Sequence, residues 1–227
     1  MTRAILLDIE GTTTPISFVY EVLFPYARAH FRDYLRDHPG AEAIALLERE
    51  AAAEPDANRA PPAGEIATYV EWLMDRDRKS PGLKSLQGLV WQSGYRDGTL
   101  KGEVFPDVPP ALERWRKRGI KTAIYSSGSV LAQRLLFSTT AFGDLTPLLS
   151  GFFDTSSGPK TSPESYARIA GALECSAGEM LFVSDVKAEI DAARVAGCDA
   201  VLCIRPANVP IHLQPTDRIV HTFDEIF

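Results

Sequence analysis

The chain has 227 residues, a formal net charge of −6 and a hydrophobic content of 45%. A chain of this length can bury roughly 70% of the surface that it exposes when unfolded, which is enough for one good core and an accessory domain. The acidic balance argues against broad binding to nucleic acids or to membrane surfaces. We expect no signal peptide or transmembrane helix, because no apolar stretch is long enough. Three cysteines without Cys-x-x-Cys spacing and four scattered histidines indicate a reduced, cytoplasmic location and no zinc site.

The first motif lies near the N-terminus. Ile5–Leu7 is a continuous apolar run of the kind that forms a strand buried on both faces. Asp8 follows it directly, and Glu10 precedes a glycine turn at Gly11. Two carboxylates at a strand exit can hold a divalent cation, or one can attack an electrophile while the other handles a proton. An Asp close to a Gly also occurs in ordinary turns, so the motif gains meaning only from its partners.

The elements expected along the chain divide it into two parts. Residues 17–100 lack a clear strand and predict helices at 41–54, 65–77 and 83–91, with a loop at 55–64. From residue 101 the pattern predicts helices at 109–118 and 130–137, and strands at 121–125, 151–153, 180–184 and 199–204. We therefore predict an α/β fold with a doubly wound, mainly parallel sheet formed by residues 1–16 and 101–227, and an inserted helical cap domain at 17–100. Such a cap would exclude water and contact the substrate, whereas the alternative is an insertion that only stabilises the fold.

Three further segments supply partners for the first motif. The turn Ser126–Ser129 joins a strand to a helix, so its amides and hydroxyls can bind an anion, although one serine can also be an ordinary helix cap. Lys160 lies in a Gly-Pro-Lys loop, where a lone lysine is usually solvated. Asp185 ends the strand near 180–184 and Glu189 follows it, and both acids would also suit capping or a solvated helix face.

Together the order Asp-x-Glu, Ser, Lys, Asp resembles the haloacid dehalogenase (HAD) superfamily of aspartyl-phosphate phosphatases. Three segments make the likeness closer. The segments 8–15 (Asp-Ile-Glu-Gly-Thr-Thr-Thr-Pro), 77–91 (with Leu-Gln-Gly) and 125–133 (with Ser-Ser-Gly-Ser) are similar to the enolase-phosphatase E1 family of methionine salvage. The resemblance extends from Ala4 to about Pro206.

This resemblance implies a catalytic site. Asp8 would form an aspartyl-phosphate, and Glu10 would protonate the leaving oxygen and later activate water. Ser126, the backbone N–H of Ser127 and Lys160 would stabilise the phosphate oxygens. Mg²⁺ would be held by Asp8, by the backbone carbonyl of Glu10 and by Asp185.

It also implies a substrate, 2,3-diketo-5-methylthiopentyl-1-phosphate, which would be enolised and then dephosphorylated to an acireductone. The base for enolisation stays open between Glu10 and a residue of the cap. Lys84 and Gln87 are expected to contact the diketone. Trp91 would either shield the methylthio end or belong to the core of the cap. We expect a monomer whose partner is this small phosphate ester.

Two features depart from the general superfamily pattern. Glu10 replaces the usual second Asp, and Ser184-Asp185 with a later Glu189 replaces Gly-Asp with a later Asp. Whether Glu189 contacts the metal or only its waters therefore stays open. The alternative functions are a HAD phosphatase of another small phosphate ester, a mutase or dehalogenase on the same fold, and a receiver-type phosphoacceptor domain. A receiver domain is roughly half as long, and its acceptor Asp follows the third strand rather than the first.

Overall fold

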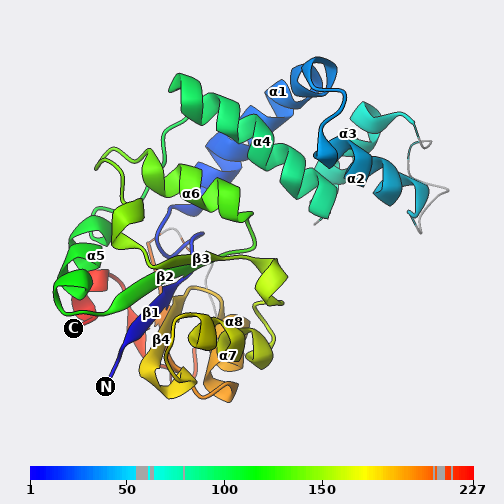
Figure 1. Ribbon diagram of the computed structural model, residues 1–227. Helices are drawn as coiled ribbons and strands as arrows, with labels where there is room; N and C mark the ends of the chain where they lie inside the picture. The colour runs from blue at the N-terminus through cyan, green and yellow to red at the C-terminus, as the bar shows by residue number, and fades with distance from the viewer. Residues whose placement is uncertain (55–60, 62–63, 79, 207, 209–212, 216) are drawn as a thin grey trace. The chain divides into compact units, whose positions relative to one another are not determined.

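The computed structural model describes residues 1–54, 61, 64–78, 80–206, 208, 213–215 and 217–227 (Figure 1). The chain forms two compact units: unit 1 comprises Met1–Val19 and Lys101–Phe227, and unit 2 comprises Tyr20–Leu100. The loop predicted at 55–64 lies outside the described residues except at 61 and 64. Over the described part of the chain, no helix has the length and apolar character needed to cross a membrane.

Unit 1 is built on a six-stranded sheet in which every pair of neighbouring strands is parallel. The strand order is β3-β2-β1-β4-β5-β6, which confirms the predicted doubly wound sheet. The strands are β1 (Ala4–Leu7), β2 (Lys121–Tyr125), β3 (Gly151–Phe153), β4 (Met180–Ser184), β5 (Asp199–Cys203) and β6 (Ile219–Val220). The two-residue strand β6 was not predicted, because so short a segment has no readable alternation.

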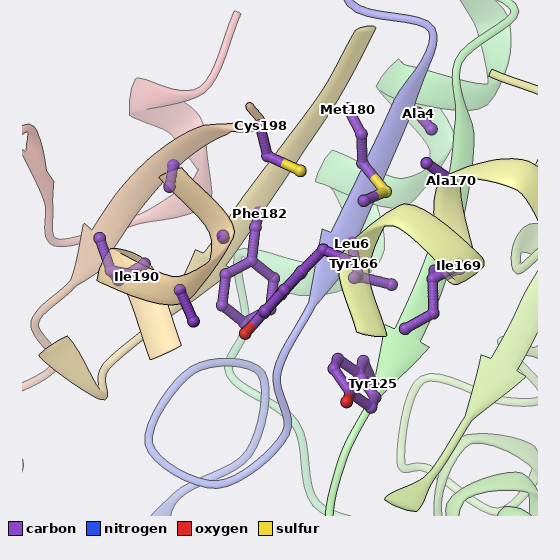
Figure 2. Packing of buried hydrophobic residues seen from close by; sticks show 14 of the residues in the cluster. Ala4, Leu6, Tyr125, Tyr166, Ile169, Ala170, Met180, Phe182, Ile190 and Cys198 are labelled. Atoms are coloured by element: carbon purple, nitrogen blue, oxygen red, sulfur yellow. The ribbon is translucent and has the colours of Figure 1, made fainter. Parts of the chain in front are cut away.

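The sheet is covered on both faces, which explains why β1 is an uninterrupted apolar run. Helices α7 (Pro163–Ala172) and α8 (Lys187–Val195) pack on one face, where Leu6 and Phe182 meet the ring of Tyr166 (Figure 2). The Tyr166 and Phe182 rings lie edge to face with centroids 4.9 Å apart. Side chains alternate along a strand, so Ile5 and Leu7 point to the opposite face. Helices α5 (Val108–Lys117) and α6 (Val130–Ser138) contact β2 and β3 respectively.

The end of the chain belongs to the core of unit 1. Trp115 of α5 is fully buried, and its indole N–H donates to the carbonyl of Ile226 at 3.1 Å. The Phe223 ring packs on the Trp115 ring, with centroids 5.5 Å apart. The last twenty residues carry no clear sequence pattern, yet these contacts bind Phe223 and Ile226 to α5.

The described residues of unit 2 form four helices, which follow a π-helical turn at Phe18–Leu23: α1 (Phe24–Asp37), α2 (Glu42–Ala52), α3 (Ile66–Asp75) and α4 (Pro81–Asp97). Helix α4 is longer than predicted at both ends. The Ser80 hydroxyl accepts from the Leu83 amide at 3.0 Å and caps its start, and Gly98 ends it in the left-handed region with φ 81°. The core of this unit includes Phe31, Leu47, Tyr69, Leu73, Leu86 and Val90.

We predict that Leu6→Ala lowers the free energy of unfolding by about 2–5 kcal/mol, because it leaves a cavity in the centre of the sheet. Urea titration followed by circular dichroism measures the change. Val195→Ala is the control: this side chain is 76% exposed, and its loss should change stability by less than about 0.5 kcal/mol. Equal effects of the two substitutions would contradict the packing described.

Candidate active site

The predicted catalytic residues of unit 1 gather where the strand order reverses. β1 pairs with β2 on one side and with β4 on the other, and open α/β sheets bind ligands at the carboxyl ends of strands at this point. Asp8 follows β1, Ser126 follows β2, and Ser184 ends β4. The strands β1, β2 and β4 thus end at the same edge of the sheet, where Asp8, Ser126 and Ser184 lie.

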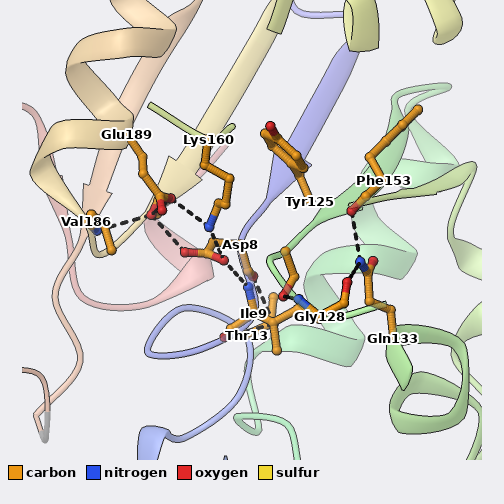
Figure 3. A network of polar contacts seen from close by, with 12 residues as sticks. Asp8, Ile9, Thr13, Tyr125, Gly128, Gln133, Phe153, Lys160, Val186 and Glu189 are labelled. Carbon is orange, nitrogen blue, oxygen red and sulfur yellow. Dashed lines mark hydrogen bonds and ion pairs between the residues drawn. The ribbon is translucent and has the colours of Figure 1, made fainter. Parts of the chain in front are cut away.

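Asp8 is buried and is held by three donors (Figure 3). Its Oδ1 accepts from the Ile9 amide at 2.7 Å and forms an ion pair with Lys160 Nζ at 2.6 Å. Its Oδ2 accepts from the Ser184 hydroxyl at 2.9 Å. The structure therefore brings Asp8 and Lys160 together, as their predicted roles require.

Lys160 is not a solvated loop lysine. Its side chain is only 11% exposed, and Nζ makes a second ion pair with Glu189 at 2.7 Å. The Tyr166 hydroxyl donates to the Lys160 carbonyl at 2.6 Å, and the Tyr125 hydroxyl donates to the Gly158 carbonyl at 2.8 Å, so two buried tyrosines hold the loop. Burial by itself lowers the pKa of Lys160, but Asp8 and Glu189 outweigh it and raise this pKa above its usual value. Lys160 therefore carries its positive charge.

Two further carboxylates crowd this lysine. Burial, followed by the charge of Asp8, raises the pKa of Asp185 to about 7, and the same two causes raise the pKa of Glu189 to about 7. Lys160 opposes both shifts. The Ser184 hydroxyl lies 2.9 Å from Asp8 Oδ2 and 3.0 Å from Glu189 Oε2. A hydroxyl has one proton, so the Ser184 hydroxyl donates to only one of these two carboxylates at a time while both are ionised.

The oxygen donors and the excess of negative charge fit Mg²⁺, which prefers carboxylate and carbonyl ligands. Asp8 and Glu189 both contact Lys160 and Ser184, and Asp185 packs against Gly11, so three carboxylates lie at this edge of the sheet. Across the described residues, no three His, Cys, Asp or Glu side chains form a metal-binding group. The predicted set differs from such a group, because it combines two carboxylates with the backbone carbonyl of Glu10.

Gly11 brings the loop that follows Glu10 directly against Asp185. Its φ is +71°, and a Cβ built on it would lie 2.3 Å from Asp185 Oδ2. Only glycine therefore allows this approach.

The turn after β2 is arranged by two residues that play different parts. Ser126 is buried, and its Oγ accepts from the Gly128 amide at 3.1 Å. Ser129 is the helix cap, because its Oγ accepts from the Ala132 amide at 3.3 Å. Ser127 is half-buried beside them. The turn thus contains the ordinary helix cap that was expected as one alternative, and this cap is Ser129 rather than Ser126.

Gln133 is a buried residue of this turn that the sequence analysis missed. Its Nε2 donates to the carbonyls of Gly128 at 3.0 Å and Phe153 at 2.8 Å, which ties the turn to β3 (Figure 3). A glutamine on the helix face that carries Leu136 and Phe137 was the available signal, since a buried amide needs partners.

The remaining predicted residues belong to unit 2. Lys84 and Gln87 are half-buried on α4. Trp91 is buried within unit 2: its indole N–H donates to the Leu23 carbonyl at 2.7 Å, and its ring stacks on Phe24. These contacts favour the core role of Trp91 over the shielding role.

Comparisons with known proteins place this site in a family. Residues 2–197 match the family model described as haloacid dehalogenase-like hydrolase. The chain is 49% identical over 230 residues to Enolase-phosphatase E1 of Synechococcus elongatus, with 98% of this chain and 96% of that protein covered. It is 52% identical over 200 residues to Enolase-phosphatase E1 of Pseudomonas aeruginosa, with 86% of each covered.

Solved structures agree with this assignment. The UTR4 protein of Saccharomyces cerevisiae is similar with a TM-score of 0.80 and 34% identity over 99% of both chains. CbbY from Rhodobacter sphaeroides, in complex with phosphate, has a TM-score of 0.62 at 17% identity over 100% of this chain and 96% of its own, and shares the fold.

We predict that Gly11→Ala is more destabilising than Gly119→Ala. Both glycines have φ +71°, so both substitutions carry the left-handed penalty of about 1–2 kcal/mol. Only Gly11 meets Asp185, whereas a Cβ on Gly119 meets nothing within 4 Å. The contact should add about 1–3 kcal/mol, measured by urea unfolding. Identical losses would show that Gly11 does not press on Asp185.

Proposed function

Because the chain belongs to the enolase-phosphatase E1 family of haloacid dehalogenase-like hydrolases, we propose that it enolises 2,3-diketo-5-methylthiopentyl-1-phosphate and then dephosphorylates it to an acireductone. The observation that carries the phosphatase step is the buried Asp8 carboxylate, held 2.6 Å from Lys160 at the exit of β1. A carboxylate fixed beside a cation is poised to attack a phosphate ester, because the cation also attracts the phosphate oxygens.

In the first half-reaction, an Asp8 oxygen forms a bond to phosphorus while the bond from phosphorus to the ester oxygen breaks. Glu10 gives its proton to that oxygen. The Ser126 hydroxyl, the Ser127 amide and Lys160 bind the equatorial phosphate oxygens, on which charge is spread during transfer.

In the second half-reaction, water attacks the phosphorus of the aspartyl-phosphate, and Glu10 accepts the proton that the water loses. The bond between Asp8 and phosphorus breaks, which releases inorganic phosphate and restores the carboxylate. Glu189 and Ser184 hold Lys160 and Asp8 in place throughout.

Mg²⁺ would be held by Asp8, Asp185 and the backbone carbonyl of Glu10. Bound there, it supplies positive charge that offsets the repulsion between the Asp8 carboxylate and the phosphate.

Enolisation requires removal of a proton from the carbon that bears the phosphate ester. Glu10 or a residue of unit 2 takes this proton. Unit 2 is also the part of the chain that we propose as the cap, with Lys84 and Gln87 as contacts for the diketone.

We predict that Asp8→Asn abolishes phosphate release, because an amide cannot form the aspartyl-phosphate. The fold should persist, since an asparagine amide can donate to Ser184, which can then donate to Glu189. Phosphate release and thermal melting are measured side by side. Near wild-type turnover in this variant would refute the nucleophile.

Mg²⁺ should raise the melting temperature of the wild type, because a ligand that binds only the folded state stabilises it, by about 2.7 kcal/mol at 100 times its Kd. Asp185→Asn should lose most of this gain. Asp199→Asn is the control, since Asp199 begins β5 and pairs with Arg218. An unchanged gain in Asp185→Asn would remove Asp185 from the ligand set.

Lys84→Ala and Gln87→Ala should lower kcat/KM for the diketone phosphate much more than for an aryl phosphate. An unpaired polar group costs about 1–3 kcal/mol, so the ratio of the two constants should change roughly 5- to 150-fold. Arg96→Ala, at an exposed position of the same helix, is the control. Equal losses on both substrates would favour a phosphatase of another small ester.

A further inference from the structure

Arg205 is a buried arginine to which neither the sequence motifs nor the proposed mechanism gives a part. It is 4% exposed and lies two residues beyond β5, past residue 197, where the match to the hydrolase family model ends. A buried guanidinium is costly unless its donors are satisfied, so its partners indicate why it is there.

Two of the three guanidinium nitrogens of Arg205 donate to the loop that carries Glu10. Nε and Nη2 donate to the Thr12 carbonyl at 3.1 and 3.0 Å. Nη1 donates to Asp107 Oδ2 at 2.9 Å and to the His221 carbonyl at 3.0 Å. The guanidinium also lies over the ring of Phe105, 4.3 Å from its centroid, which restricts its tilt.

The loop that Arg205 contacts, residues 9–14, is compact. A displacement of Thr12 therefore also displaces its neighbours in the loop. The amides of Thr12, Thr13 and Thr14 all donate to the Ile9 carbonyl, at 2.9–3.1 Å, and the Gly11 amide donates to the Thr14 carbonyl at 2.8 Å. Glu10 lies inside this turn. Movement of Thr12 therefore moves the backbone of Glu10.

Neighbouring carbonyls of the loop are held in the same manner. The Phe105 amide donates to the Thr13 carbonyl at 2.9 Å, and Asn208 Nδ2 donates to the Gly11 carbonyl at 2.9 Å. Three successive carbonyls are thus bound from two places in the chain, by Phe105 and by the neighbouring residues Arg205 and Asn208. Arg205 is the only one of the three that brings two donors to its carbonyl, in the fork geometry that lysine lacks.

We propose that Arg205 is a positioning residue for proton transfer, which holds the Thr12 carbonyl and thereby places Glu10 against the leaving oxygen. This inference rests on the proposed phosphatase function. It requires that loss of Arg205 weaken the step in which the ester oxygen takes the proton of Glu10 much more than it weakens attack by Asp8.

The test uses the leaving group as the readout. The value of kcat/KM is measured for p-nitrophenyl phosphate, whose leaving oxygen needs little protonation, and for phenyl phosphate, whose leaving oxygen needs more. The variants are Arg205→Lys, Arg205→Met and Glu10→Gln. Arg194→Lys is the matched control, because Arg194 bonds to Asp217 and the Ala200 carbonyl, away from the loop.

We expect Arg205→Met to lose on the order of 100-fold on phenyl phosphate, since a misplacement of about 1 Å at a reacting group has this effect. It should lose only a few-fold on p-nitrophenyl phosphate, in parallel with Glu10→Gln. Arg205→Lys should show the same bias more weakly, and Arg194→Lys should show none. Melting temperatures are recorded for all variants.

Equal losses on both esters would overturn the inference, because a purely structural role lowers all turnover alike. Should Arg205→Met fail to fold, Arg205→Lys decides, since lysine keeps a positive charge beside Asp107. Failure of Arg205→Lys to fold would assign a purely structural role and also overturn the inference. Absence of phosphate release by the wild type from the diketone phosphate as well as from both aryl esters would instead refute the proposed function.

Discussion

The ion pair between Asp8 and Lys160 is the interaction on which the rest of the site depends. A carboxylate this deeply buried needs a compensating charge, and Lys160 supplies it from a loop 152 positions later in the chain. The lysine in turn depends on Glu189, Tyr166 and Tyr125, which hold its ammonium group and its loop. The buried face beneath α7 and α8 therefore also supports the groups that we propose to be catalytic.

The balance of charge around this pair explains the chemistry that the site favours. Asp8, Asp185 and Glu189 share Lys160, and the pKa values of Asp185 and Glu189 rise to about 7. A site in this state gains stability from any added positive charge. In the proposed function, a divalent cation would satisfy these carboxylates, after which Lys160 would have donors to offer to an anionic substrate. The crowding of acids would thus be a source of affinity for the metal.

Much of the fold follows from the sequence because buried parallel strands are continuous apolar runs. The four strands predicted at 121–125, 151–153, 180–184 and 199–204 appear with at most one residue of difference, and Asp8 lies at the end of β1 as expected. The features that the sequence did not predict were missed for physical reasons. Arg205 and Gln133 act on backbone carbonyls, which every residue has and which no sequence pattern displays. The strand β6 and the C-terminal segment are set by single contacts to distant elements rather than by periodicity.

The central position of β1 in the sheet has a consequence for folding during synthesis on the ribosome. β1 is made first, yet its partners β2 and β4 lie more than a hundred positions later, and Ser184 is 176 residues from Asp8. At translation rates of about 5–20 residues per second, roughly 9 to 35 s pass while the ribosome synthesises these 176 residues. During this time the apolar segment of β1 has no partner strand on either side, and an unpaired apolar strand is prone to aggregation. Unit 2 is complete at residue 100, so it can fold while β1 is still unpaired. Asp8 therefore leaves the ribosome well before Lys160 and Ser184, the partners that hold its carboxylate in the folded protein.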